Sequence, residues 1–121
     1  MRVALAAPTA SAARETVGRV LGDQPRETAD TARLLTSELV ANALQHGGGV
    51  EEVIVQRLEN VLRVEVLDSS PRLPTTANPS PSQTRGRGLL LVAALATRWA
   101  AEPAVQGKVV SFELQLADRP R

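Results

Sequence analysis

Three polar side chains recur every four residues along a segment that has the pattern of an amphipathic helix. They are Glu38, Asn42 and His46, and apolar residues of the segment 34–45 recur at helical spacing beside them. Side chains four residues apart share one face of a helix, so a carboxylate, an amide and an imidazole form one polar stripe. The stripe is either a solvated face or the lining of a cavity that holds a polar ligand. In a cavity, Asn42 offers an oxygen suited to Mg²⁺, and Glu38 can take a proton from a nucleophile.

A carboxylate stands at the end of a predicted strand. Asp68 follows the alternating run 62–67 and precedes Ser69, Ser70 and Pro71. An aspartate at a strand end can accept a hydrogen bond from an exocyclic amine inside a pocket. It can equally be an ordinary turn or cap residue, because aspartate side chains readily bond to the backbone of a turn.

A run of glycines comes before a third predicted helix. Gly86-Arg87-Gly88 is followed by Leu89, where we expect a helix that continues to Trp99. Glycines at such a position leave backbone N–H groups free to approach phosphates, and the helix dipole favours an anion there. An ordinary junction between a loop and a helix is the alternative.

Three familiar motifs are incomplete in this chain. The run 46–49 resembles the oxyanion loop of esterases, but the chain has no G-x-S-x-G and no second histidine for a catalytic triad. Gly107-Lys108 lacks the other residues of a phosphate-binding loop. The glycine run 86–88 is followed by leucine where a dinucleotide-binding fingerprint has its third glycine.

The composition excludes several classes of protein. With a net charge of +1, no basic run, one Trp, one Phe and no Tyr, the chain offers neither an electrostatic surface nor a stacking platform for nucleic acid. It has no Cys and one His, which excludes disulfides and sites rich in thiolate or histidine. No apolar stretch reaches the roughly 20 residues of a membrane span, and Pro8 interrupts the short apolar run at the N-terminus. We therefore expect a cytoplasmic protein without direct nucleic-acid or membrane contacts.

The elements that must position these residues alternate between helices and strands. The expected elements are an edge strand at 3–5, a helix at 11–21, a helix at 27–45, a hairpin of strands at 53–58 and 62–67, a helix at 89–99 and a strand from residue 107. The segment 71–87 contains four prolines and no acidic residue, and a loop of this length is typically a functional lid or a linker. We expect one domain, residues 1–117, and a frayed tail, residues 118–121.

In their order and spacing, these motifs resemble those of the GHKL ATPases, which include gyrase, a heat-shock chaperone and the histidine kinases. Within that superfamily, the chain is most similar to the small anti-sigma-factor serine kinases and their stand-alone actinobacterial relatives. The N box of the family corresponds to ELVANALQHG, and its first glycine box corresponds to residues 68–74. Its second glycine box corresponds to TRGRGLLLVAALATRW, and its closing strand corresponds to GKVVSFEL. The resemblance implies a two-layer α/β sandwich, the Bergerat ATP-binding fold, with helices on one face of a mixed, mostly antiparallel sheet.

The resemblance also implies ATP and Mg²⁺ as ligands and assigns roles to the motif residues. Glu38 would be the general base, Asn42 the Mg²⁺ ligand and Asp68 the reader of the adenine amine, while His46 would approach the phosphates. The nucleotide-binding set would be completed by Ser70, Arg85, Gly86, Arg87, Gly88 and Leu89. Two positions depart from the family pattern, since Ser70 and Ala100 stand where relatives have glycine.

The function that the resemblance implies is a regulatory serine/threonine kinase that phosphorylates an anti-sigma-factor antagonist. A sigma factor is the second partner that the resemblance implies, and the sequence does not decide whether the protein forms a homodimer. The alternative is a non-catalytic adenine-nucleotide-binding interaction module. The detached catalytic domain of a sensor histidine kinase fits less well, because the single histidine, His46, already lies in the N box.

Overall fold

The structure is a computed structural model that describes residues 1–46, 48–70 and 84–117. This part of the chain forms three helices and five strands. In chain order they are β1 (Arg2–Ala6), α1 (Ala10–Leu21), α2 (Arg26–His46), β2 (Val50–Leu58), β3 (Val61–Asp68), α3 (Thr84–Leu95), β4 (Arg98–Ala104) and β5 (Gly107–Gln115). Most of the predicted lid segment, 71–83, and the predicted tail lie outside the described residues.

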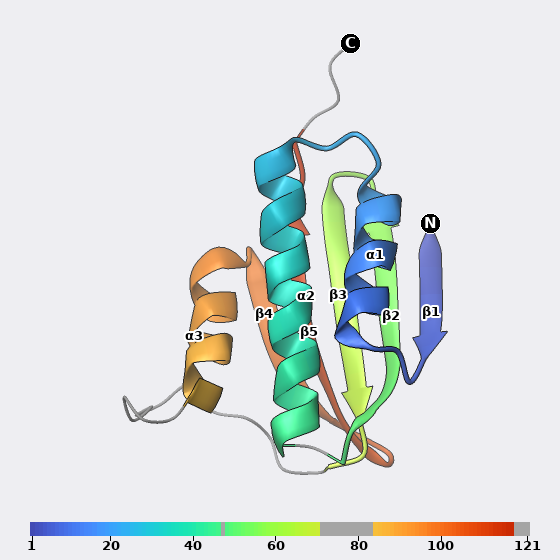
Figure 1. The fold of residues 1–121 in the computed structure, drawn as a ribbon, viewed down its shortest axis with the longest axis vertical. Helices are drawn as coiled ribbons and strands as arrows, with labels where there is room; N and C mark the ends of the chain where they lie inside the picture. The colour runs from blue at the N-terminus through green and yellow to red at the C-terminus, as the bar shows by residue number, and fades with distance from the viewer. Residues whose placement is uncertain (47, 71–83, 118–121) are drawn as a thin grey trace.

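The strands form one open sheet in the order β1-β2-β3-β5-β4. Each neighbouring pair is antiparallel, so within the described residues the sheet is fully antiparallel rather than mixed. The helices all lie on the same face of the sheet (Figure 1). This two-layer α/β sandwich is the fold that the sequence predicted.

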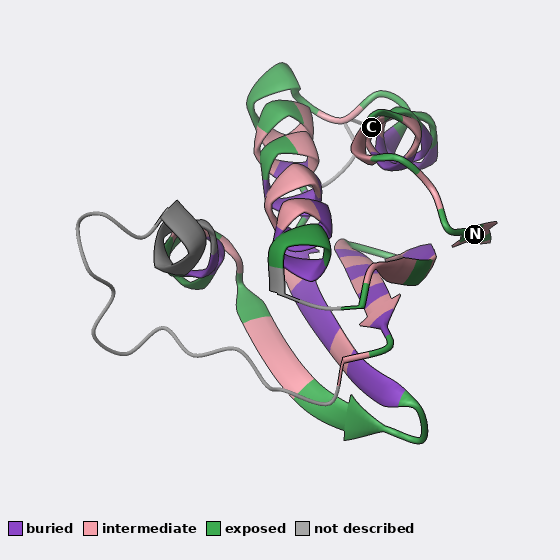
Figure 2. Cartoon of the chain, turned by 60° about the horizontal axis from the view of Figure 1, so that its bottom comes forward, coloured by how far each residue is buried: buried purple, intermediate pink, exposed green. Residues whose placement is uncertain are grey.

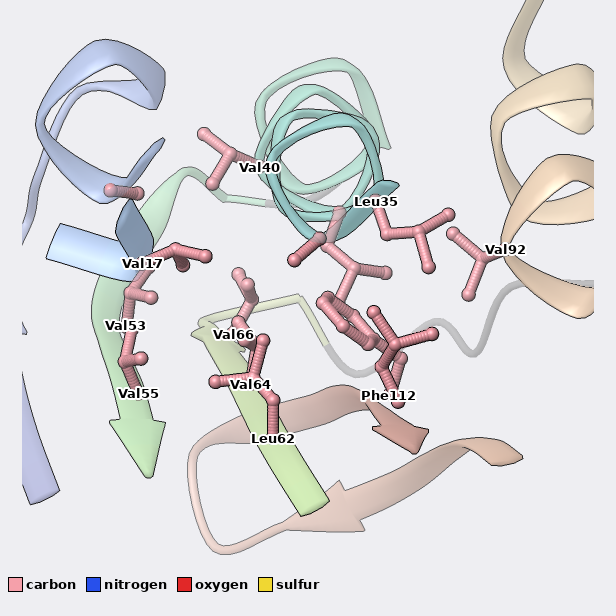
Figure 3. Close-up of a cluster of buried hydrophobic side chains, with 14 of the residues drawn as sticks. Val17, Leu35, Val40, Val53, Val55, Leu62, Val64, Val66, Val92 and Phe112 are labelled. Carbon is pink, nitrogen blue, oxygen red and sulfur yellow. The ribbon is translucent and has the colours of Figure 1, made fainter. Parts of the chain in front are cut away.

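The core lies between the sheet and the helices. Side chains alternate along a strand, and in β3 Leu62, Val64 and Val66 point toward the helices with at most 1% of their surface exposed. They belong to the same buried cluster as Phe112 of β5 and Leu35 of α2 (Figure 3). Full burial of such a side chain stabilises the fold by about 1.5–3 kcal/mol.

α2 packs one side against the sheet along its length. Leu35, Leu39 and Ala43 are buried on that side, so the apolar spacing of the sequence identified it correctly. Figure 2 shows the same division, with the buried side of the helix turned toward the strands. α1 packs beside α2 and ends at Gly22, as predicted, where φ is 62°.

The prediction of a helix from Leu89 to Trp99 was wrong at both ends. α3 begins at Thr84 and ends at Leu95, and the edge strand β4 follows from Arg98. The glycines of the run 86–88 suggested a loop, and the alanines of the segment 93–101 suggested a helix, because glycine disfavours and alanine favours helix. Pairing with β5 outweighs this local preference, since Trp99 lies across from Phe112 and packs against the core.

Candidate functional site

The segments that carry the candidate residues converge at one end of the sandwich. In Figure 1, α2, β3 and the turn between β4 and β5 reach the lower end of the molecule, and α3 begins at the lower left, on the other side of α2 from that turn. The pairing of β3 with β5 contributes to this convergence, because it places Asp68, at the end of β3, directly across from Lys108, at the start of β5.

α2 presents Glu38 and Asn42 one helical turn apart, as the spacing predicted. Asn42 is 6% exposed and Glu38 is half-buried. Within the described residues, neither side chain forms a hydrogen bond or an ion pair. The Asn42 amide is not one of the fully buried unpaired groups, so it reaches solvent and has hydrogen-bonding capacity that a ligand would satisfy. His46 is the last residue of α2, and the contacts predicted for its side chain lie outside the described residues.

The two carboxylate oxygens of Asp68 differ in their hydrogen bonds. Ser70 N donates a hydrogen bond of 2.8 Å to Oδ1, and Lys108 Nζ donates another of 3.0 Å to the same atom. Oδ2 also lies 3.0 Å from Lys108 Nζ, but it receives no hydrogen bond from the described residues. Oδ1 therefore holds the turn at Ser70, as the turn interpretation predicted, and both oxygens face the Lys108 ammonium. The interpretation of Asp68 as the acceptor of a ligand amine stays a prediction.

Lys108 is a site residue that the sequence reasoning missed. It is 1% exposed and pairs with Asp68, which is 2% exposed. Its position was readable in part, because residue 108 shares a strand face with the apolar residues 110, 112 and 114. A lone lysine on an apolar face signals a buried partner, but only the strand pairing identifies Asp68 as that partner.

Two glycines let neighbouring segments approach the end of β3 closely. A Cβ on Gly107 would collide with the backbone oxygen of Asp68 and lie 2.8 Å from the Cα of Ser69. Gly107 also has a φ of 147°, a backbone conformation that residues with a side chain rarely adopt. A Cβ on Gly48, in the turn after α2, would collide with the Ser69 hydroxyl. The backbone around Asp68 is therefore closely enclosed from two sides.

A cavity of about 330 Å³ opens at this end of the sheet. Its lining includes Asp68 and Lys108. The other lining residues come from β2, β3 and the β4–β5 turn: Glu51, Leu67, Ala104, Val105 and Gln106. The volume falls at the small end of the range of about 300–1,000 Å³ that is usual for sites of small molecules. Neither Glu38 nor Asn42 of α2 is among its described lining residues, so this cavity holds the Asp68 end of the candidate site alone.

The second glycine box lies within the first turns of α3 rather than before the helix. α3 includes Arg85, Gly86, Arg87 and Gly88, and the contacts predicted for their side chains lie outside the described residues. Leu89 is 2% exposed and belongs to the core cluster. Its side chain therefore serves packing, and a contact with phosphate would have to come from its backbone.

The donor set at this end of the molecule fits an adenine nucleotide with Mg²⁺. The buried Oδ2 of Asp68, which pairs with Lys108 but accepts no hydrogen bond, suits an amine. The amide of Asn42 suits a hard cation that keeps phosphates and waters in its shell. Within residues 1–46, 48–70 and 84–117, no three His, Cys, Asp or Glu side chains cluster as a metal site.

No helix among the described residues has both the length and the apolar character needed to cross a membrane.

Comparisons with known proteins agree with this architecture. The model of a family described as the histidine kinase-like ATPase domain matches residues 3–114. A comparison with curated proteins gives no significant match. Among solved structures, the histidine kinase domain of a blue-light activated histidine kinase from Erythrobacter litoralis is 23% identical, with a TM-score of 0.59. A longer structure of that kinase is 24% identical, with a TM-score of 0.58.

Each of these two alignments covers 88% of this chain, while the chain spans 59% of the first structure and 40% of the second. At these identities the likeness shows a shared fold. The family model extends over the α2 stripe, the end of β3 and the start of β5, which are the segments that converge at the candidate site. The chain therefore belongs to the histidine kinase-like ATPase domain family, whose fold binds ATP.

Proposed function

We propose that this domain is a serine/threonine protein kinase that uses Mg²⁺-ATP to phosphorylate an anti-sigma-factor antagonist. The observation that carries the proposal is the environment of Glu38. This carboxylate is half-buried, one helical turn from Asn42, and without an ion-pair partner in the described residues. It is therefore free to accept a proton, and a domain that only binds nucleotide has less need of such a group beside a metal ligand.

The nucleotide is held by residues from three elements in this proposal. Asp68 accepts a hydrogen bond from the adenine amine through Oδ2, the oxygen that has no hydrogen bond in the structure. Asn42 would hold Mg²⁺, and the start of α3 would offer backbone N–H groups and the positive end of its dipole to the phosphates. When bound, Mg²⁺ neutralises part of the phosphate charge.

The contribution of this chain to the reaction is positioning and proton transfer. The acceptor serine oxygen bonds to the γ-phosphorus, while the bond from that phosphorus to the β–γ bridging oxygen breaks and ADP leaves with the electron pair. Glu38 takes the proton of the serine hydroxyl. Most of the rate enhancement comes from holding the reactants in line, as in other phosphoryl transfers.

The proposed partners are an antagonist that bears the acceptor serine and a sigma factor, in the cytoplasm where sigma factors act. A phosphoserine adds a charge of about −1.5 to −2 at neutral pH. This charge would weaken the return of the antagonist to the kinase and so favour exchange of partners.

The decisive experiment is mass spectrometry of the antagonist after incubation with the protein and Mg²⁺-ATP. We expect a phosphoserine with the wild type and a rate about 10²–10⁴-fold lower with Glu38→Gln, because a general base typically contributes that much. Binding of ATP to Glu38→Gln, measured by calorimetry, should be close to that of the wild type, since Asn42 and Asp68 remain.

Glu27→Gln is the matched control, because Glu27 is an exposed residue in the first turn of the same helix. This variant should keep the full rate. Tight, ATP-dependent association with the antagonist but no phosphate transfer would contradict the kinase and identify the non-catalytic interaction module instead. Loss of both ATP binding and activity in a well-folded Glu38→Gln variant would assign Glu38 a structural role.

A further inference from the structure

The Asp68–Lys108 pair presents two unlike groups side by side. Lys108 is the only lysine of the chain, and it is buried on the helix-facing side of β5. Its Nζ lies 3.0 Å from Asp68 Oδ2. Oδ2 is an acceptor without a hydrogen bond, and Nζ belongs to a group that only donates.

The ammonium group of Lys108 also has spare capacity. It has three N–H donors. One donates to Asp68 Oδ1 at 3.0 Å, and another donates to the backbone oxygen of Ser70 at a longer 3.5 Å. Asp68 Oδ2 also lies 3.0 Å from Nζ, but without the geometry of a hydrogen bond. Both residues line the cavity at this end of the sheet, so a ligand there would meet a donor and an acceptor side by side.

We propose that Lys108 is a specificity-determining residue, which donates a hydrogen bond to N1 of the adenine ring while Asp68 Oδ2 accepts one from the N6 amine. This proposal rests on the nucleotide binding proposed above. In adenine, the N6 donor and the N1 acceptor are neighbours on one edge of the base. An acceptor and a donor only 3.0 Å apart are complementary to that edge.

The same pair discriminates against guanine at two atoms rather than one. Guanine has an oxygen where adenine has its amine, and an N–H where adenine has the N1 acceptor. Asp68 would then face an acceptor, and Lys108 would face a donor. Sites built on buried hydrogen-bonding groups reject mismatched analogues strongly, because those groups are left unpaired.

The first test uses the wild-type protein and three nucleotides in calorimetric titrations with Mg²⁺. 1-Deaza-ATP keeps the N6 amine but lacks the N1 acceptor. We expect it to bind about tenfold to a hundredfold more weakly than ATP, because hydrogen bonds to charged groups are among the stronger ones. 7-Deaza-ATP, which loses a ring nitrogen away from this edge, is the matched control and should bind like ATP.

The second test removes the lysine without leaving a buried charge. Lys108→Met alone would leave the Asp68 carboxylate unpaired and could unfold the domain. The double variant Asp68→Asn/Lys108→Met is neutral at both positions and keeps an amide oxygen for the N6 amine. After circular dichroism has confirmed its fold, it should bind ATP and 1-deaza-ATP with equal affinity.

The outcomes separate this inference from the proposed function. Equal binding of ATP and 1-deaza-ATP by the wild type would overturn the role of Lys108 and leave nucleotide binding intact. If ATP itself does not bind, both proposals fail. A preference for ATP over 1-deaza-ATP that persists unchanged in the double variant would also overturn the role of Lys108, because the discrimination would then come from another group.

Discussion

At the scale of single residues, a partly exposed ion pair and a buried ion pair differ in how far water screens them. Arg63 lies 2.9 Å from Glu113, but about 30% of its side chain is exposed, so water screens the pair. Lys108 and Asp68 have side chains that are 1% and 0% exposed. Exposed pairs contribute about 0–1 kcal/mol, whereas removing one member of a buried pair leaves an uncompensated charge.

We therefore predict that Asp68→Asn lowers the free energy of unfolding by about 3–5 kcal/mol, because Lys108 loses its counter-charge. Asp30→Asn is the control, since Asp30 pairs only with exposed arginines and its side chain is 62% exposed. That change should cost no more than about 1 kcal/mol. Urea denaturation measures both values, and similar losses for the two variants would mean that the buried pair does not hold the fold.

At the scale of elements, the turn between β4 and β5 depends on Gly107. This residue begins β5 with a positive φ and packs against the backbone of Asp68. In the register of β5 against β3, the next residue, Lys108, lies across from Asp68.

Gly107→Ala should destabilise the domain by more than the ~1–3 kcal/mol of a strained backbone conformation, because the added methyl group also collides with backbone atoms. Gly22→Ala is the matched control, since Gly22 also has a positive φ but no atom lies within 4 Å of the added Cβ. The two variants are compared by chemical denaturation. Equal destabilisation would show that the close approach to Asp68 is not needed.

At the scale of the whole molecule, the candidate site exists only when the helices and the sheet are assembled. Its residues come from α2, β3 and β5, which the unfolded chain does not hold together. A ligand of this site therefore binds only the folded state, and it raises the stability of the domain by mass action.

Mg²⁺-ATP at about one hundred times its Kd should raise the free energy of unfolding by about 2.7 kcal/mol. For a domain of this size, such a change moves the melting temperature by several degrees. Removing Mg²⁺ with a chelator should abolish most of the shift, and GTP should produce little of it. Thermal melts followed by circular dichroism provide the measurement, and an equal shift with GTP would contradict the adenine-specific site.

Local patterns in the sequence identified the elements other than α3 and β4, together with the buried faces of α2 and β3. The spacing of Glu38 and Asn42 identified the polar stripe of α2, because an α-helix returns to the same face about every four residues. The alternation in β3 identified its buried face for the equivalent reason in strands. The motif order allowed the family to be recognised, and the position of Asp68 at a strand end was correct.

Only the tertiary structure decided which of these faces meet. Lys108 and Asp68 are 40 residues apart, and they become partners because β5 pairs with β3 in one particular register. The segment that contains Trp99 has a helical composition but forms β4, because pairing with β5 and packing on the core outweigh its local preference. Local propensity is a property of neighbours in the chain, whereas strand pairing and burial depend on residues that only the fold brings together.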